Sequence, residues 1–441
     1  MPGPFFFARV LLINLRIMIH VLNIVEIVEH REEFFKQCYV ITTNSAHCGA
    51  RRMAETAAHL DDNVIPRQPV RQWVISFPTP LRILLASQPQ LLSPVLQVIH
   101  RTISSFLIKQ AGFRADEAHT GAITLIQRFG SAANLNIHLH CLFLDGVYRL
   151  IDGKAVFHPF SPPNTLQLQI VLQRLIQRLM RCLVRRGVLV EDQGQLYLDE
   201  HESTAPSMTP LQASSCSYRI ALGPRAGQKI LTLQTVEPNA TAYPSTRDRC
   251  VNHQGFSLHA NTYCAPTDRQ KLERLCRYIT RPALANERIK IRQNGDVVLK
   301  LKSPYKDGTT HIVMSPLEFL QKLAALVPRP RLNLIRYFGV LAPNAKLRPL
   351  VVPHPPDSDS RSVTEQDESA PTPRQHISWA RLLKRVFNID IHTCPHCQGN
   401  LKILASIEDP PTIAKILKHL DLPTRAPPRA PARLPDGFDF I

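Results

Sequence analysis

Hydrophobic and polar residues alternate along the segment that follows Asn134, and this pattern is typical of a β-strand with one buried face. One face would carry hydrophobic side chains, namely Leu135, Ile137, Leu139, Cys141 and Phe143. The other would carry polar ones, namely Asn134, Asn136, His138 and His140. Asp145-Gly146 follows directly, and this pair is a turn signal that predicts a hairpin.

The same reading predicts an ordered succession of strands and helices. Further strands are expected at 72–77, 122–129, 155–157, 230–235, 297–302, 311–314, 333–340 and 401–405. Helices are expected at 48–60, 91–107, 165–186, 267–280, 316–326, 379–387 and 411–420. Strands mixed with helices predict an α+β fold, with helices covering one face of an antiparallel sheet. The second face of such a sheet is available for a functional site.

The length of 441 residues exceeds that of one ordinary domain. We predict a main domain over 71–350. Residues 353–376 are rich in Pro, Ser, Asp and Glu and predict a disordered linker. A small C-terminal segment at 377–422 and a basic, Pro-rich tail at 423–441 would follow.

Charge points to a polyanionic partner. Lys and Arg number 53 against 35 Asp and Glu, which gives a net charge of +18 and favours nucleic acid. The helix at 165–186 carries a basic stripe, Arg174, Arg178, Arg181, Arg185 and Arg186, which the sequence alone interprets as a solvated face.

The ten cysteines are scattered and predict a reducing, cytoplasmic setting. The apolar run at 5–28 is interrupted by Arg9, Arg16, His20 and Glu26, so we expect neither a membrane anchor nor a signal peptide.

His138 and His140 are candidate metal ligands, because they share one strand face and imidazole readily binds divalent metals. The alternative is that the two histidines bind no metal and are ordinary hydrogen-bonded or exposed residues.

A basic helix carries the second candidate group, Tyr278. Thr267 or Asp268 would cap this helix, and Leu272, Leu275 and Ile279 would face the core. Lys271, Arg274, Arg277 and Arg281 surround the tyrosine and are the predicted DNA-binding residues. Guanidinium groups favour the phenolate and bind the phosphate that it would attack. The alternative is a tyrosine that caps a core beside solvated arginines.

Cys394-Pro-His-Cys397 supplies two thiolates at zinc-ligand spacing, and His392 or His396 would add a third ligand. The alternative is a turn that carries two reduced thiols.

Several segments together resemble the rolling-circle transposases of the insertion-sequence-ninety-one type and their common-region relatives, within the His-hydrophobe-His endonuclease superfamily. The segments are Trp73–Pro78, Gly121–Gly130, Asn136–His140, Leu275–Pro282, Ser303–His311 and Tyr337–Asn344, and the likeness covers about 48–434. The resemblance implies Mg²⁺ or Mn²⁺ on His138 and His140, with Gln127 as third ligand. It further implies attack by Tyr278 on single-stranded DNA at element ends, a 5′-phosphotyrosine link and strand transfer.

The chain departs from the pattern of these relatives in two places. Arg274 stands where many of them carry a second tyrosine, so the chain resembles the single-tyrosine, common-region-like members. Relatives also carry a Cys-rich zinc module, of which residues 46–70 look like a remnant; Cys48, with Cys38 and His47, is what is left of its ligands. Residues 1–45 look like a non-homologous leader, and the loss predicts impaired recognition of element ends.

The expected partners are single-stranded element ends and target DNA, with no membrane and no small-molecule substrate. Two alternatives remain: a non-catalytic DNA-binding remnant, and a metal-dependent hydrolase of a small substrate. The Tyr278→Phe substitution separates them, since only the transposase loses a covalent adduct with DNA.

Overall fold

The computed structural model describes residues 46–192, 195–198, 208–235, 249–284, 288–305, 307–329, 331–353, 377–387 and 410–419, with single positions at 390, 391, 393, 399 and 421. The chain divides into two compact units. One is Ile27–Ala370, and the other joins Met1–Glu26 with Pro371–Ile441.

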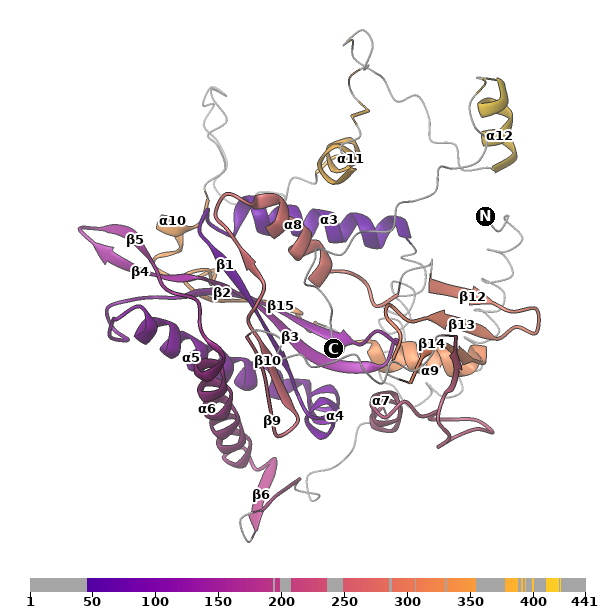
Figure 1. Cartoon of the computed structure of the whole chain (residues 1–441), viewed down its shortest axis with the longest axis horizontal. Coiled ribbons are helices and arrows are strands. Elements are labelled where there is room, and N and C mark those ends of the chain that lie inside the picture. The colour runs from indigo at the N-terminus through magenta and orange to yellow at the C-terminus, as the bar shows by residue number, and fades with distance from the viewer. Residues whose placement is uncertain are drawn as a thin grey trace, which may run out of the picture. The chain divides into compact units, whose positions relative to one another are not determined.

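The larger unit is built on a seven-stranded sheet with the strand order β15-β2-β3-β1-β10-β9, and β11 also pairs with β1 (Figure 1). Every pairing in this sheet is antiparallel. The strands are β1 (Val70–Ser76), β2 (Gly121–Phe129), β3 (Leu135–Leu144), β9 (Cys250–His253), β10 (Phe256–His259), β11 (Tyr263–Cys264) and β15 (Ile335–Gly339). The α+β prediction with an antiparallel sheet is therefore confirmed.

The helices of this unit are α3 (Ala46–Asn63), α4 (Thr79–Ser87), α5 (Leu92–Gln110), α6 (Thr165–Val184), α7 (Thr209–Cys216), α8 (Arg269–Ile279), α9 (Pro316–Leu326) and α10 (Arg348–Val351), with a short 3-10 turn at Pro89–Leu91. Their ends follow local chemistry. Asn164 begins α6 and Ser315 begins α9, each in a capping box with the residue three positions on.

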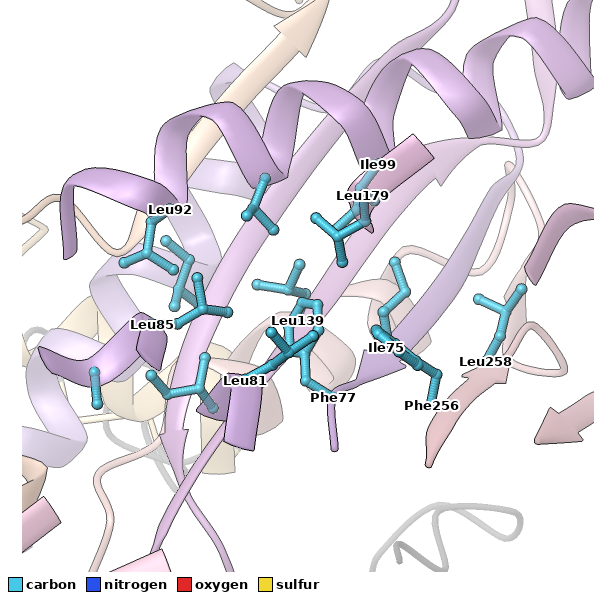
Figure 2. Close-up of a cluster of buried hydrophobic side chains, with 14 of the residues drawn as sticks. Ile75, Phe77, Leu81, Leu85, Leu92, Ile99, Leu139, Leu179, Phe256 and Leu258 are labelled. Carbon is cyan, nitrogen blue, oxygen red and sulfur yellow. The ribbon is translucent and has the colours of Figure 1, made fainter. Parts of the chain in front are cut away.

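The hydrophobic core lies between one face of the large sheet and helices α4, α5 and α6. Figure 2 shows Leu92 and Ile99 of α5 and Leu179 of α6 over Leu139 and Ile75 of the sheet. The five hydrophobic residues expected on one face of β3 are all in this core and fully buried. The alternation predicted for β3 is thus confirmed, and its polar face is directed away from this core.

A second, four-stranded sheet has the order β12-β13-β14-β8. Its strands are β8 (Leu231–Gln234), β12 (Ile289–Ile291), β13 (Val297–Lys300) and β14 (Thr309–Met314). The predicted hairpin of β13 and β14 is confirmed by their antiparallel register. Two further hairpins join β4 (Gly146–Ile151) to β5 (Lys154–Pro159) and β6 (Leu189–Asp192) to β7 (Gln195–Leu198).

The hairpin turn predicted at Asp145-Gly146 is wrong. β3 and β4 do not pair; β4 pairs with β5, and the turn is made by Asp152 and Gly153, both at positive φ. Asp145 instead accepts two hydrogen bonds from Arg71, at 2.9 and 2.7 Å, in a buried ion pair. Gly146 is required for space, because a Cβ there would lie 2.2 Å from the Phe157 ring.

In the smaller unit the structure describes α11 (Trp379–Phe387) and α12 (Pro410–His419), as predicted. The leader at 1–45, the linker, the strand expected at 401–405, the tail, and the possible zinc ligands Cys394 and Cys397 lie outside the described residues. Within the described part of the chain, one helical stretch, Pro89–Gln110, has the length and apolarity of a membrane span; 61% of its most apolar window is buried, as in a core helix.

Candidate active site

His138 and His140 lie side by side on the face of β3 that points away from the core of Figure 2. Their ring centroids are 4.9 Å apart. Gln127 of β2 is the register partner of His138, and its Oε1 lies 3.4 Å from His140 Nε2. His140 is 1% exposed and Gln127 4%, so the polar cluster is enclosed. The three predicted metal ligands are therefore brought together by the pairing of β2 with β3.

Neighbouring groups hold the two imidazoles through Nδ1. His138 Nδ1 lies 2.8 Å from the carbonyl oxygen of Asn136, which fixes the proton on Nδ1 and leaves a lone pair on Nε2. His140 Nδ1 lies 2.7 Å from the side-chain amide of Gln72 in β1.

The amide orientation of Gln72 decides the tautomer of His140. Gln72 Oε1 is buried with no hydrogen-bond partner among the described residues, whereas its Nε2 faces the imidazole. Gln127 Oε1, an acceptor, lies 3.4 Å from His140 Nε2, so with these partners His140 accepts at Nδ1 from Gln72 and donates from Nε2 to Gln127. A metal bound at Nε2 would require the other tautomer, in which Nδ1–H pairs with the Gln72 oxygen after its amide turns over.

Both histidines are neutral at pH 7. Burial lowers the pKa of His138 to about 4; the Asn136 carbonyl opposes this shift, and Arg281 and Arg82 add to it. Burial, together with His138 and Arg281, holds the pKa of His140 well below its usual range. Neutral imidazole is the form that binds a metal.

Helix α8 carries Tyr278 to this cluster. Asp268 caps the helix by accepting from the backbone N–H of Lys271, as predicted. Leu272, Leu275 and Ile279 are buried, also as predicted. Gln127 Nε2 donates to the carbonyl oxygen of Ile279 at 3.3 Å, so the residue after the tyrosine contacts a candidate metal ligand.

Arg281 connects the tyrosine electrostatically to the histidines. Its Cζ lies 3.9 Å from the centroid of the half-buried Tyr278 ring. The same guanidinium contributes to the lowered pKa of both His138 and His140. Lys302, after β13, has its Nζ 5.3 Å from the Tyr278 centroid, and burial, together with Arg281 and Arg288, lowers the pKa of this lysine to about 7. One guanidinium and a lysine that is partly charged at pH 7 thus lie with the phenol beside two neutral imidazoles, an arrangement suited to a phosphate group.

Arg281 acts on the phenol in the predicted direction, but burial outweighs it. Burial raises the pKa of Tyr278 above its ordinary value, and the Arg281 charge and hydrogen bond, which favour the phenolate, offset only part of this. Tyr278 is therefore a neutral phenol at pH 7.

The other predicted DNA-binding residues occupy different positions along α8. Arg274 is exposed and Lys271 half-buried, toward the start of the helix. Arg277 pairs with Glu273 of the same helix at 3.9 Å.

Sequence reasoning did not find Gln72, Arg82 or Lys302, which reach the site from other elements. Their residue types and spacing carry no signal of this placement, because each comes from a separate strand or helix.

The arrangement differs from a structural zinc site, which has four protein ligands. No three His, Cys, Asp or Glu side chains cluster as a metal site within the described residues. Two imidazoles and one amide oxygen would leave positions open for water or a phosphate oxygen on any ion held there. Cys48 lies in the first turn of α3, and its side chain is outside the described part of the chain.

Helix α3 fixes the start of α8. Arg269 forms an ion pair with Asp61 at 2.7 Å and donates to the carbonyl oxygens of Ile65 and Pro66 at 3.1 Å. Helix α8 is therefore anchored at its first residue by Asp61 and contacts Gln127 at its last residue, Ile279.

Comparison with known proteins gives one match. The Y2_Tnp family model, described as "Putative transposase", matches residues 121–348, a span that contains Gln127, both histidines and Tyr278. Searches of curated proteins and of solved structures gave no match. Because the matched span is more than half of the chain, the protein belongs to this family of transposases.

Proposed function

We propose that this transposase is a metal-dependent tyrosine endonuclease and strand transferase that acts on single-stranded DNA by a rolling-circle mechanism. One observation carries the proposal: the end of α8 contacts Gln127, so that Tyr278, Arg281 and the His138–His140 pair meet on one face of the sheet. The resemblance of the sequence motifs to rolling-circle transposases supports the same conclusion.

The reaction would begin with attack of the Tyr278 oxygen on the scissile phosphorus. A bond from phosphorus to the phenolic oxygen forms, and the bond from phosphorus to the 3′ oxygen breaks. The phenolic proton is released and the departing 3′ oxygen gains one, so the products are a 5′-phosphotyrosine and a free 3′-OH. Attack by another 3′-OH on the phosphotyrosine reverses these bonds and joins strands without ATP.

Positive charge around Tyr278 would bind the phosphate through its non-bridging oxygens. Arg281 lies against the ring, and Lys302 is next to it. Because the phenol is neutral, Arg281, with Lys302 when it is protonated, would also stabilise the phenolate as it forms in the transition state.

A divalent cation, Mg²⁺ or Mn²⁺, would be held by His138, His140 and Gln127. When bound, it supplies Lewis acidity toward a phosphate oxygen. Gln72 and the Asn136 carbonyl contact Nδ1 of the two imidazoles, so Nε2 of each is the nitrogen that would bind the ion.

The chain would supply one nucleophile at this site, because Arg274 is exposed at the position one turn before Tyr278. Tyr337 lies on edge strand β15, opposite Ile123 of β2, and is assigned a structural role.

The test is covalent capture. The full chain is incubated with a pool of single-stranded oligonucleotides and Mn²⁺, and the residue joined to DNA is identified by mass spectrometry. We expect an adduct on Tyr278 that disappears in Tyr278→Phe and persists in the control Tyr337→Phe. Salt-sensitive binding with no adduct would favour the DNA-binding remnant, and an adduct that persists in Tyr278→Phe would refute the nucleophile.

A further inference from the structure

Helices α5 and α6 form a basic surface on the side of the large sheet opposite the histidines. Neither helix contains an Asp or Glu. Their exposed basic side chains, with the two that follow α6, are Arg101, Lys109, Arg174, Arg178, Arg181, Arg185 and Arg186. These seven residues are called the α5–α6 basic face.

The arginines of α6 form a straight row. At 3.6 residues per turn, Arg174, Arg178, Arg181 and Arg185 fall within an arc of about 60°, and the row is about 17 Å long. Arg178 also donates to Thr102 Oγ1 of α5 at 3.3 Å, which joins the row to the neighbouring helix. Burial of Leu172 and Leu183 fixes this orientation, since both lie in the core on the opposite side of α6.

The row brings like charges together without local compensation. Arginines three and four apart repel one another, at a cost of about 0.2–0.5 kcal/mol per pair. Other helices in the protein pair their arginines: Arg51 contacts Glu55 in α3 at 2.9 Å, and Arg277 contacts Glu273 in α8. A row that lacks acids along its whole length is complementary to an extended polyanion.

Duplex DNA fits the basic face better than a single strand does. Proteins that hold single strands stack the bases on exposed aromatic side chains. The exposed large hydrophobic residues of α5 and α6 are Leu166 and Ile170, neither of them aromatic. A rigid row of guanidinium groups matches the phosphates of a regular backbone, which bind without base readout.

The basic face and the candidate active site lie on opposite sides of β3. Leu139 packs toward α5 and α6, while His138 and His140 lie on the other face. We propose that the α5–α6 basic face binds the phosphate backbone of a duplex DNA segment, separate from the single strand held at Tyr278. The presence of a single strand at Tyr278 rests on the proposed function. Duplex binding by the basic face does not depend on chemistry at Tyr278.

The test uses the full chain with Arg174→Gln and Arg181→Gln combined. Binding to a 30-base-pair duplex is measured by fluorescence anisotropy across a range of salt concentrations. Each lost phosphate contact reduces the slope of log K against log salt by about 0.9, so we expect a slope smaller by about 1.8. The matched control combines Arg51→Gln with Arg114→Gln, which removes two arginines that already pair with Glu55 and Asp116.

An unchanged slope in the α6 variant would overturn the proposal. An equal reduction of the slope in the control would also overturn it, because the change in net charge alone would then explain the result. Loss of binding to anionic vesicles with duplex binding intact would also overturn it. The same variant should keep the adduct on single-stranded oligonucleotides, and loss of the adduct would place the basic face in the single-strand path instead. If the wild type forms no adduct but its duplex binding depends on these arginines, the proposed function fails and the basic face stands.

Discussion

The candidate site depends at the residue scale on which nitrogen of each imidazole carries the proton. A metal needs an unprotonated nitrogen, and both rings use Nδ1 for a hydrogen bond within the protein. Gln72 is therefore a positioning residue for His140, although it lies 68 positions away in the sequence.

Replacing Gln72 with Leu should weaken Mn²⁺ binding by about 10- to 100-fold, because His140 would lose the side-chain amide that holds its ring at Nδ1. Calorimetric titration of the full chain with Mn²⁺ measures this. His140→Ala is the reference variant. It should lose more Mn²⁺ binding and more cleavage than Gln72→Leu does. Its affinity for DNA should be nearly unchanged, because phosphate contacts elsewhere carry that affinity. Unaltered Mn²⁺ affinity in Gln72→Leu would refute the positioning role, and unaltered cleavage in a His138→Ala, His140→Ala double variant would remove the metal assignment.

Lys322 of α9 gives a pH-dependent prediction. It is 3% exposed, its Nζ has no hydrogen-bond partner among the described residues, and burial lowers its pKa to about 8. Below pH 8 the lysine is charged in the folded and in the unfolded protein, so the full free-energy cost of burying its charge is present. Between about pH 8 and 10.5 only the unfolded state keeps the proton, so stability rises with pH.

Lys322→Met should therefore raise the free energy of unfolding at pH 7 by up to about 3 kcal/mol, from a pKa shift of about 2.5 units. The gain should shrink toward pH 10.5. Urea unfolding of both proteins at pH 7 and pH 10 checks this, and an equal gain at the two pH values would contradict it.

Several site residues were predictable because they sit in local patterns. Strand alternation placed His138 and His140 together, and helix periodicity placed Tyr278 beside Arg281. The presence of Gln72 and Lys302 at the site was not predictable, because contacts between segments far apart in the sequence place them there. The predicted effect of Arg281 on the Tyr278 pKa is present, but the net rise was not predictable, because the sequence shows neighbouring charges and not the burial that outweighs them.

At the scale of elements, long periodic segments were predictable and short ones were not. The helices α6, α8 and α9 and the strands β2 and β3 follow clear periods with capping residues. The hairpin of β9 and β10 escaped notice, because its four-residue strands meet at Gln254-Gly255 rather than Asn-Gly. The turn at Asp145-Gly146 was wrongly placed because the sequence does not reveal the ion pair of Asp145 with Arg71.

The ion pair that anchors α8 to α3 gives a prediction for protein stability. Arg269→Met removes the ion pair with Asp61 and leaves that buried carboxylate without its partner, so we expect a loss of about 3 kcal/mol in unfolding free energy. Adduct formation should fall at temperatures where the variant is still folded, because α8 positions Tyr278. The control Arg274→Met changes an exposed arginine of the same helix and should leave the melting temperature within about 2 °C. Equal melting temperatures for Arg269→Met and wild type would contradict the anchoring role.

At the scale of the whole molecule, composition and charge indicated a DNA-binding protein before any contact was known. The α+β class followed from the mixture of periods along the chain. The strand order did not, because β1 pairs with β3 and β10, elements about 70 and 190 positions away. Such pairings arise from tertiary packing rather than from any local signal.

The described core and the candidate site both lie within residues 46–353. The large hydrophobic cluster runs from Trp73 to Leu326, and the anchor of α8 begins at Asp61. A fragment of residues 46–353 should therefore unfold cooperatively and form the Tyr278 adduct with single-stranded DNA. A shorter fragment, 71–353, lacks α3 and the partner of Arg269, so it should melt at lower temperature and give less adduct. Calorimetry and adduct yield compare the two. If 46–353 failed to fold, the smaller unit would be required for the stability of the larger one; if both fragments behaved alike, α3 would have no part in holding the nucleophile.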